Sequence, residues 1–445
     1  MAITLVLIAR LTIFVRQRPG AEFTQIDGLA ALQIILVILT CAVLFVFSFR
    51  YVIWERLVRT SGSMFVLYYV FSGFSAIWSP LPVYSFFRAI EYLSQILIIF
   101  VVIWYSANFS NAERRVLFLS FIVLLLGVGL NVKFRGLSLN LYQWHTNHYS
   151  VSAAMVFCYC FGEVLSYPGE RLRRLWLYGL GALAFLVLGT SIASFFAAGM
   201  GVIVAILLSK QGRALFMPLL LAVSLTSGLI VLTNTMPANP SWIDLGERLK
   251  IVSSDSGGAL TLSFHGRSLL WEQYLQEIVE SPIYGHGFAV SARLAKWYTT
   301  NTHNGFLAAL LGTGVIGLTI MCWGWFRLSR EIKNSLQSRA LGTVGCAAAF
   351  TAALINNMSI SFVGEQWRDP SFVFVSILAL YLLFILKSKE TPVLSPQTFH
   401  VAAASWRRAA MLPLVPLTPF KHSIGTAEQR SLAMNRRHMA WHRGR

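Results

Sequence analysis

Long apolar runs alternate with short polar connections along most of the chain, and the chain turns polar and basic after Leu386. A run of about 20 apolar residues is long enough to cross a bilayer as a helix. On this basis we predict membrane spans near 27–49, 64–79, 92–108, 116–131, 149–165, 174–190, 191–208, 215–233, 305–326, 340–357 and 371–386. A further run at 2–15 is short and is interrupted by Arg10, so a twelfth span stays open. The pattern predicts an all-α polytopic membrane helix bundle with about 11–12 transmembrane helices.

One polar stretch, Thr233 to Asn304, is far longer than the other connections between apolar runs. Cytoplasmic loops carry the excess of Lys and Arg, and here the basic residues gather in alternate short loops. These residues are Arg50, Arg56, Arg59, Arg114, Arg115, Arg171, Arg173, Arg174, Lys210, Arg213, Arg327, Arg330, Lys333 and Arg339. The large loop therefore falls on the extracytoplasmic side, whereas Arg16 and Arg18 disagree with this count. We predict an N-terminal bundle (1–232), the loop (233–304), C-terminal membrane helices (305–386) and a basic cytoplasmic tail (387–445).

Composition agrees with a membrane protein, since 56% of residues are hydrophobic, 12% are charged and the mean hydropathy is +0.63. The formal net charge is +18, and the tail contributes ten Lys or Arg against two Glu. A tail of this kind is predicted to be disordered and held near anionic lipid headgroups. Nucleic-acid binding is the other interpretation of a basic tail, but no recognition motif accompanies it, so we expect no nucleic-acid partner.

Within the large loop, apolar residues recur at helical spacing after Ser268, and the run ends at Glu280-Ser281-Pro282. This pattern predicts an amphipathic helix with Arg267 at its N-terminal end. Free N–H groups, the helix dipole and a guanidinium converge there, which suits a phosphate or pyrophosphate. The alternative is that Arg267 pairs with a loop carboxylate such as Asp255 or Glu272.

His303 and Asn304 stand where the loop meets the next apolar run. The positive end of a helix dipole disfavours the charged form of a histidine, so His303 is a candidate general base. The alternative is an interfacial histidine that caps the helix. Gly312, Gly314 and Gly317 further along predict close helix packing.

Other polar residues on the predicted outer side are candidates to line the same site. They are Arg88, Glu91, His145, Asn147, His148, Arg248 and Lys250. An ionisable residue at membrane depth is costly to bury unpaired, which favours a functional role. Arg88 and Glu91 are three residues apart, so mutual neutralisation on a helix is an equal alternative.

Several motifs of cofactor and metal chemistry are missing from the chain. It contains only Asp27, Asp244, Asp255 and Asp369, with no Asp-x-Asp pair, no phosphate-binding Gly-rich loop and no His-Glu-x-x-His. His145 and His148 have helical spacing but no evident carboxylate or cysteine partner. We therefore expect no metal and no cofactor.

These residues resemble the O-antigen ligase and polymerase superfamily, which includes Wzy-type O-antigen polymerases and bacterial exopolysaccharide polymerases. The resemblance covers about 64–320 and is carried by ordered motifs: Trp78-Ser79-Pro80-x-Pro82 with Arg88, His145-x-Asn147, Gly266-Arg267-x-x-x-Trp271, Ser281-Pro282-x-x-Gly285-x-Gly287-Phe288 and His303-Asn304-Gly305-Phe306 with Gly312. The first and third motifs are most similar to the exopolysaccharide branch. One departure is Thr190-Ser191-Ile192-Ala193-Ser194, where relatives often carry a Ser-Arg pair.

The resemblance implies a GT-C-like glycosyltransferase of the cytoplasmic membrane with its large loop on the periplasmic side. Its donor would be an undecaprenyl-pyrophosphate-linked glycan used in exopolysaccharide, O-antigen or lipopolysaccharide biosynthesis. Arg267 would hold the pyrophosphate and His303 would activate the acceptor, with Arg88, Arg248, Asn304, His145 and Asn147 as further substrate-binding candidates. Membrane lipids, a chain-length regulator and a flippase are expected partners. Polymerase is the leading interpretation and O-antigen ligase the nearest alternative; a transporter or flippase is a third, although the chain has no convincing internal repeat.

Overall fold

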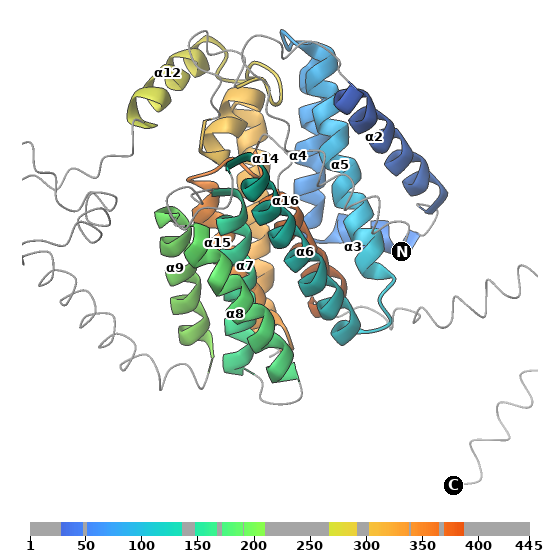
Figure 1. The fold of residues 1–445 in the computed structure, drawn as a ribbon. Helices are drawn as coiled ribbons and strands as arrows, with labels where there is room; N and C mark the ends of the chain where they lie inside the picture. Colours follow the sequence, from blue (N-terminus) through green and yellow to red (C-terminus); the bar gives the residue numbers. More distant parts are fainter. Residues whose placement is uncertain are drawn as a thin grey trace, which may run out of the picture. The chain divides into compact units, whose positions relative to one another are not determined.

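A computed structural model describes residues 28–47, 51–135, 147–166, 171–189, 191–209, 267–291, 302–337, 340–364 and 369–386 (Figure 1). All of them belong to one compact unit, Met1–Glu390. Within these ranges the regular structure is helical: α2 (Gly28–Phe47), α3 (Tyr51–Arg59), α4 (Gly62–Phe74), the 3₁₀ turn η1 (Ser75–Ile77), α5 (Pro82–Trp104), α6 (Phe109–Arg135), α7 (Asn147–Ser166), α8 (Arg171–Gly189), α9 (Ile192–Leu208), α12 (Arg267–Glu280), α14 (Gly305–Gln337), α15 (Thr343–Asn357), α16 (Asp369–Leu380) and the π-helical turn η3 (Tyr381–Ile385). The predicted spans 2–15 and 215–233 and the tail lie outside the described residues.

The membrane-helix prediction is confirmed for the described part of the chain. Helices at Pro82–Trp104, Tyr149–Ser166, Arg171–Gly189 and Gly305–Gln337 are long and apolar enough to cross a bilayer. Shorter apolar helices cover Gly62–Ile77, Ala193–Leu208, Thr343–Asn357 and Pro370–Ile385. The protein is an all-α polytopic membrane protein.

The two largest differences between predicted and observed span boundaries are at the start of α5 and at the end of α14. The helix predicted to begin at residue 92 begins ten residues earlier, at Pro82 of α5. Proline suits the first helical turn, where its missing N–H costs nothing, and the following Arg88 and Glu91 lower the hydropathy of that first part. The span predicted at 305–326 continues to Gln337. In this extension, Glu331 accepts a hydrogen bond from the Ser61 N–H at 2.7 Å.

The centre of the bundle is α7, which packs against α8, α9 and α15 (Figure 1). Small residues let these helices approach closely. A Cβ on Gly162 would lie 2.9 Å from the Gly345 Cα, and one on Gly345 would lie 2.5 Å from the Tyr159 carbonyl oxygen. This contact joins α7 to α15 in the way that small residues join membrane helices generally. The helices α4, α5 and α14 pack beside one another as a second group.

Buried charges tie the helices together at the end of the bundle that carries Arg59, Arg171 and Arg327, which we call the basic end. Glu113 of α6 is fully buried and accepts hydrogen bonds from Arg171, from Arg174 at 2.8 Å and from the Tyr159 hydroxyl at 2.7 Å. Glu163 of α7 pairs with Arg171 at 3.2 Å and accepts the Gly345 N–H at 3.0 Å. Each of the two buried carboxylates therefore accepts hydrogen bonds from a charged arginine and from a neutral hydroxyl or N–H group.

Candidate functional site

The opposite end of the bundle, which we call the loop end, is organised around a break in α14. Gly314 has φ 64° and ψ −168°, so the helix is interrupted there. In a continuous helix the N–H groups of Val315 and Ile316 would bond to the carbonyls of Leu311 and Gly312. Here those four groups bond to the segment 282–288 instead, which we call the docking loop.

Four backbone hydrogen bonds join the docking loop to the break. Val315 and Ile316 donate to the carbonyls of Pro282 and Ile283 at 2.9 and 3.5 Å, and His286 and Gly287 donate to those of Leu311 and Gly312, both at 2.8 Å. Two helical hydrogen bonds are thus replaced by four bonds to another segment. Irregular backbone at membrane depth needs such partners. The motif Ser281-Pro282-x-x-Gly285-x-Gly287 is explained by this docking.

Glycine is required on both sides of this contact. A Cβ on Gly285, which has φ +69°, would lie 2.6 Å from backbone atoms of residues 312–314, and one on Gly314 would lie 2.1 Å from the Ile283 carbonyl oxygen. Only glycine adopts positive φ without strain and leaves this space free. The expectation that Gly312 and Gly314 allow close packing of another helix is therefore wrong, because the segment packed against them is the docking loop.

The Trp78-Ser79-Pro80 corner holds the other side of the docking loop. Trp78 Nε1 donates to the Tyr284 carbonyl at 3.1 Å, and Ser75 Oγ accepts the Phe288 N–H at 2.8 Å. A Cβ on Gly287 would lie 2.3 Å from Ser79 Oγ. Two motifs that are about 200 residues apart in the sequence therefore form one structural unit.

The amphipathic helix predicted in the large loop is confirmed as α12, which begins at Arg267 and ends at Glu280. Trp271 Nε1 donates to the Thr302 carbonyl at 2.9 Å, and Tyr274 is buried against Leu311. Arg267 is therefore at the N-terminus of α12, as predicted, while its side chain lies outside the described residues. Trp271 links this helix to the residue that precedes His303.

His303 occupies the last position before the cap of α14. Asn304 is the cap, because its Oδ1 accepts the N–H groups of Phe306 and Leu307 at 3.0 and 3.1 Å. His303 is half-buried and has φ 50°, a left-handed conformation that is uncommon outside glycine. The alternative that His303 itself caps the helix is wrong. Because Asn304 Oδ1 serves as the cap, its amide nitrogen is the part of the side chain left for a substrate.

Gly305, the first residue of α14, fits between α15 and the segment 358–364. A Cβ on Gly305 would lie 2.3 Å from Asn357 Oδ1, and one on Gly364 would lie 2.1 Å from the Gly305 carbonyl oxygen. The motif His303-Asn304-Gly305 is thus pressed against the end of α15, and glycine is the residue that allows it.

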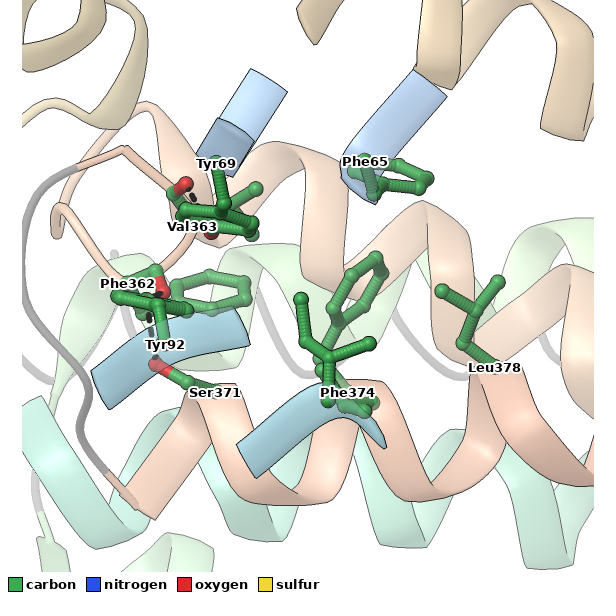
Figure 2. A pocket seen from close by; sticks show the side chains of 10 residues that line it. Phe65, Tyr69, Tyr92, Phe362, Val363, Ser371, Phe374 and Leu378 are labelled. Carbon is green, nitrogen blue, oxygen red and sulfur yellow. Dashed lines mark hydrogen bonds between the residues drawn. The ribbon is translucent and has the colours of Figure 1, made fainter. Parts of the chain in front are cut away.

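Three buried tyrosines hold the segment that contacts Gly305. Tyr68 and Tyr69 donate their hydroxyls to the carbonyls of Gly364 and Val363 at 2.8 and 2.6 Å, and Tyr92 donates to that of Phe362. Figure 2 shows Tyr69 and Tyr92 directed at these carbonyls, with Ser371 beside Tyr92. Phe288 of the docking loop packs edge-on against all three rings, at centroid distances of 6.0–6.3 Å. The docking loop and the seat of His303 therefore share one aromatic cluster.

Arg88 lies one turn before Tyr92 on α5. Its guanidinium pairs with Glu91 at 2.7 Å and lies 5.1 Å from the ring centre of Tyr84, and its side chain is 23% exposed. The two charges therefore neutralise each other, as one of the two predicted alternatives states. The Arg88 Nε is buried and has no partner within the described residues, so one donor of the group is not used by this pair.

The remaining predicted site residues are only partly described. Asn147 is the first residue of α7, with its side chain outside the described residues. His145, Arg248 and Lys250 also lie outside them, as does the side chain of His148. Of the candidates, the structure describes side-chain contacts of Asn304, Arg88 and Glu91 and the backbone conformation of His303, and their functional roles stay predictions. Sequence reasoning missed Asn356 and Asn357, although two consecutive amides at the end of an apolar run are a visible signal.

One group of potential metal ligands occurs in the described part of the chain. Ligand atoms of Glu277, Glu280 and His286 lie within 4.8 Å of one another. His286 Nε2 is already 2.7 Å from the Glu277 carbonyl oxygen, and Glu280 is exposed. Exposed acidic groups of this kind are common without a metal, so the cluster does not alter the metal-free expectation.

Comparison with known proteins places these motifs in context. A family model described as O-Antigen ligase matches residues 177–322, a range that includes α12, the docking loop and His303. The resemblance to the O-antigen ligase family is confirmed.

A protein of Rickettsia conorii (strain ATCC VR-613 / Malish 7) named "Putative polysaccharide ligase RC0486" is 24% identical over 234 residues, which cover 49% of this chain and 54% of the relative. The chain thus spans about half the length of this curated relative. Together with the family match, this likeness agrees with a ligase-like or polymerase-like enzyme and does not distinguish between the two.

Proposed function

We propose that this protein is a membrane glycosyltransferase that polymerises oligosaccharide repeat units carried on undecaprenyl pyrophosphate, in exopolysaccharide or O-antigen biosynthesis. The observation that carries the proposal is the position of His303. It is held at the mouth of α14 by Asn304 and Gly305 and follows Thr302, which is bonded to α12. The O-antigen ligase match spans the same region.

The proposed reaction needs a base, a group that binds pyrophosphate and no metal. The acceptor hydroxyl gives its proton to the His303 imidazole while its oxygen bonds to the anomeric carbon of the donor glycan. The bond from that carbon to the pyrophosphate oxygen breaks, with inversion, and lipid pyrophosphate leaves. Donors at the N-terminus of α12, including Arg267, would stabilise the charge on the leaving group.

The proposed location is the cytoplasmic membrane, with the loop end on the extracytoplasmic side. The basic end carries Arg59, Arg115, Arg171 and Arg327, which supports a cytoplasmic assignment for that end. Arg88, Arg248, Asn304, His145 and Asn147 are the further residues proposed to contact pyrophosphate or glycan. Chain-length regulator and flippase proteins are the proposed protein partners.

The test is polymer length in a deletion strain that expresses His303→Gln or Arg267→Ala. Both variants are expected to insert normally and to leave single carrier-linked repeat units. His286→Gln is the matched control, because His286 lies at the same end of the bundle and glutamine retains a donor for the Glu277 carbonyl. Long polymer made at the normal level by inserted His303→Gln protein would refute the catalytic role.

The second candidate function is an O-antigen ligase that transfers finished glycan to the lipid A core. The description of the matching family and the name of the Rickettsia relative favour it. Analysis of carrier-linked glycans in a deletion strain distinguishes the two functions. A polymerase leaves single repeat units on the carrier, whereas a ligase leaves long chains there and none on lipid A.

A further inference from the structure

The helix α15 ends in two consecutive asparagines that are completely buried. Asn356 and Asn357 are both 0% exposed, and the amide nitrogen of each has no hydrogen-bond partner within the described residues. Buried amide donors in native proteins are almost always paired, because an unmade hydrogen bond costs the whole desolvation of the group. A donor of this kind beside the start of α14 is therefore available to a ligand.

The orientation of Asn357 is fixed by its neighbour. Its Oδ1 accepts the Val363 N–H at 3.2 Å, and a backbone N–H can only donate, so the other atom of the amide must be the nitrogen. This nitrogen would lie 2.4 Å from a Cβ on Gly305. The free donor therefore lies against the first residue of α14, two residues after His303.

The Asn356 side chain contacts the start of α9. Its Oδ1 accepts the Ser194 hydroxyl at 3.2 Å, and that hydroxyl is also 3.2 Å from Ser191 Oγ. Ser191 and Ser194 are buried as well. The end of α15 thus carries neutral polar groups between the N-termini of α9 and α14.

The chemistry of these groups selects the ligand. The unpaired atom of the Asn357 side chain is an N–H donor, so it needs an oxygen with a free lone pair. The Asn356 amide is not fixed in this way, because its partner is a hydroxyl, which can donate or accept. The N-terminus of a long helix adds a positive partial charge, which favours a negatively charged oxygen over a neutral hydroxyl. A phosphate oxygen meets both requirements.

We propose that the Asn357 amide nitrogen forms a donor subsite that binds a phosphate oxygen of the lipid-linked pyrophosphate. This inference rests on the proposed function, since it assumes a donor on a pyrophosphate carrier. It assigns part of the leaving-group binding to a neutral amide at the end of α15, beside the proposed base, in addition to any arginine of the loop.

The test is binding of farnesyl pyrophosphate to the purified full-length protein in nanodiscs, measured by calorimetry. Asn357→Asp is the decisive variant, because it keeps the oxygen that accepts the Val363 N–H and replaces the free donor with an acceptor. We expect its affinity to fall at least tenfold. The control is Asn108→Asp, an exposed residue of the basic end whose oxygen accepts the Asn111 N–H at 2.9 Å.

A structure of the wild-type protein with the same probe gives an independent measurement, which also serves if a variant does not fold. We expect a phosphate oxygen within hydrogen-bond distance of the Asn357 amide nitrogen. Unchanged affinity in folded Asn357→Asp, or ordered water alone beside Asn357 when the probe is bound elsewhere, would overturn the subsite.

The failures of the two proposals are distinguishable. If wild-type protein binds the probe, Asn357→Asp binds it equally well and His303→Gln abolishes polymer, the subsite is wrong and the proposed function stands. If Asn357→Asp weakens binding while His303→Gln makes normal polymer, the subsite stands and the assigned base is wrong. A wild-type protein that does not bind the probe contradicts both.

Discussion

Replacing Gly314 by alanine should release the docking loop from α14 without unfolding the bundle. The added Cβ would lie 2.1 Å from the Ile283 carbonyl oxygen and 2.6 Å from the Tyr284 nitrogen, at φ +64°. Neither neighbour is the end of a flexible side chain, so the backbone of the docking loop must move. Its four hydrogen bonds to residues 311–316 then lengthen or break.

The magnitude follows from these contacts. A left-handed conformation costs a non-glycine residue about 1–2 kcal/mol, and overpacking a tight contact typically costs about 1–3 kcal/mol. Together they give about 2–5 kcal/mol. Because each 1.4 kcal/mol is a factor of ten, even the lower figure raises the population of the open docking loop about 30-fold. The four hydrogen bonds, each worth about 1 kcal/mol, oppose this opening.

Hydrogen–deuterium exchange in nanodiscs measures this opening directly. The amides of His286, Gly287 and Val315 should exchange at least about 30-fold faster in Gly314→Ala, while those of α7 should be unchanged. Gly199→Ala is the control, since that glycine has no atom within 4 Å of an added Cβ. Wild-type exchange at these three amides in the Gly314→Ala protein would refute the docking argument, as would uniform acceleration throughout the bundle.

Three further predictions concern the groups that support the bundle and its loop end. Glu113→Gln should destabilise the protein by about 3 kcal/mol in thermal unfolding, because it removes the fully buried charge that pairs with the partly buried Arg171 and Arg174. Glu55→Gln, in a more exposed pair, should change stability by less than about 1 kcal/mol, and equal effects would contradict the buried network. Asn304→Asp should keep its stability, because aspartate also caps a helix, but should lose polymer synthesis, because it removes the amide nitrogen proposed to contact substrate. Asn304→Ala should in addition lose about 1 kcal/mol of stability, and normal synthesis by Asn304→Asp protein would exclude the amide from the substrate contacts. Tyr69→Phe should cost about 1–3 kcal/mol by leaving the Val363 carbonyl unpaired, and an unchanged unfolding midpoint would argue against that hydrogen bond.

Much of the fold could be predicted from hydropathy alone, because a bilayer demands long apolar helices. The start of α5 could not, since the charges of Arg88 and Glu91 interrupt the apolar signal although they pair within the helix. The break in α14 was also hidden. Gly314 sits in a continuous apolar run, and its conformation depends on a docking loop about 30 residues earlier in the chain.

The candidate site was predictable where one residue carries a local signal. Asn304 before Gly305 marks a helix start, and Glu280-Ser281-Pro282 marks the end of α12. Contacts between distant segments were not predictable. Nothing near Tyr69 in the sequence indicates that its hydroxyl bonds to Val363, because such pairings depend on tertiary packing that no local pattern records.

The two contacts between loop and bundle have a joint consequence for His303. Before it, the Thr302 carbonyl is bonded to Trp271 of α12; after it, Leu311 and Gly312 are bonded to the docking loop. The short half of α14 between these points is therefore attached to the large loop at both ends, and the break at Gly314 separates it from the longer half. The side-chain hydrogen bond from Trp271 and the backbone hydrogen bonds of the docking loop therefore make the position of His303 depend on the position of the large loop. The break at Gly314 frees the longer half of α14 from this dependence, because no continuous helical ladder joins the two halves, and that half stays packed in the bundle.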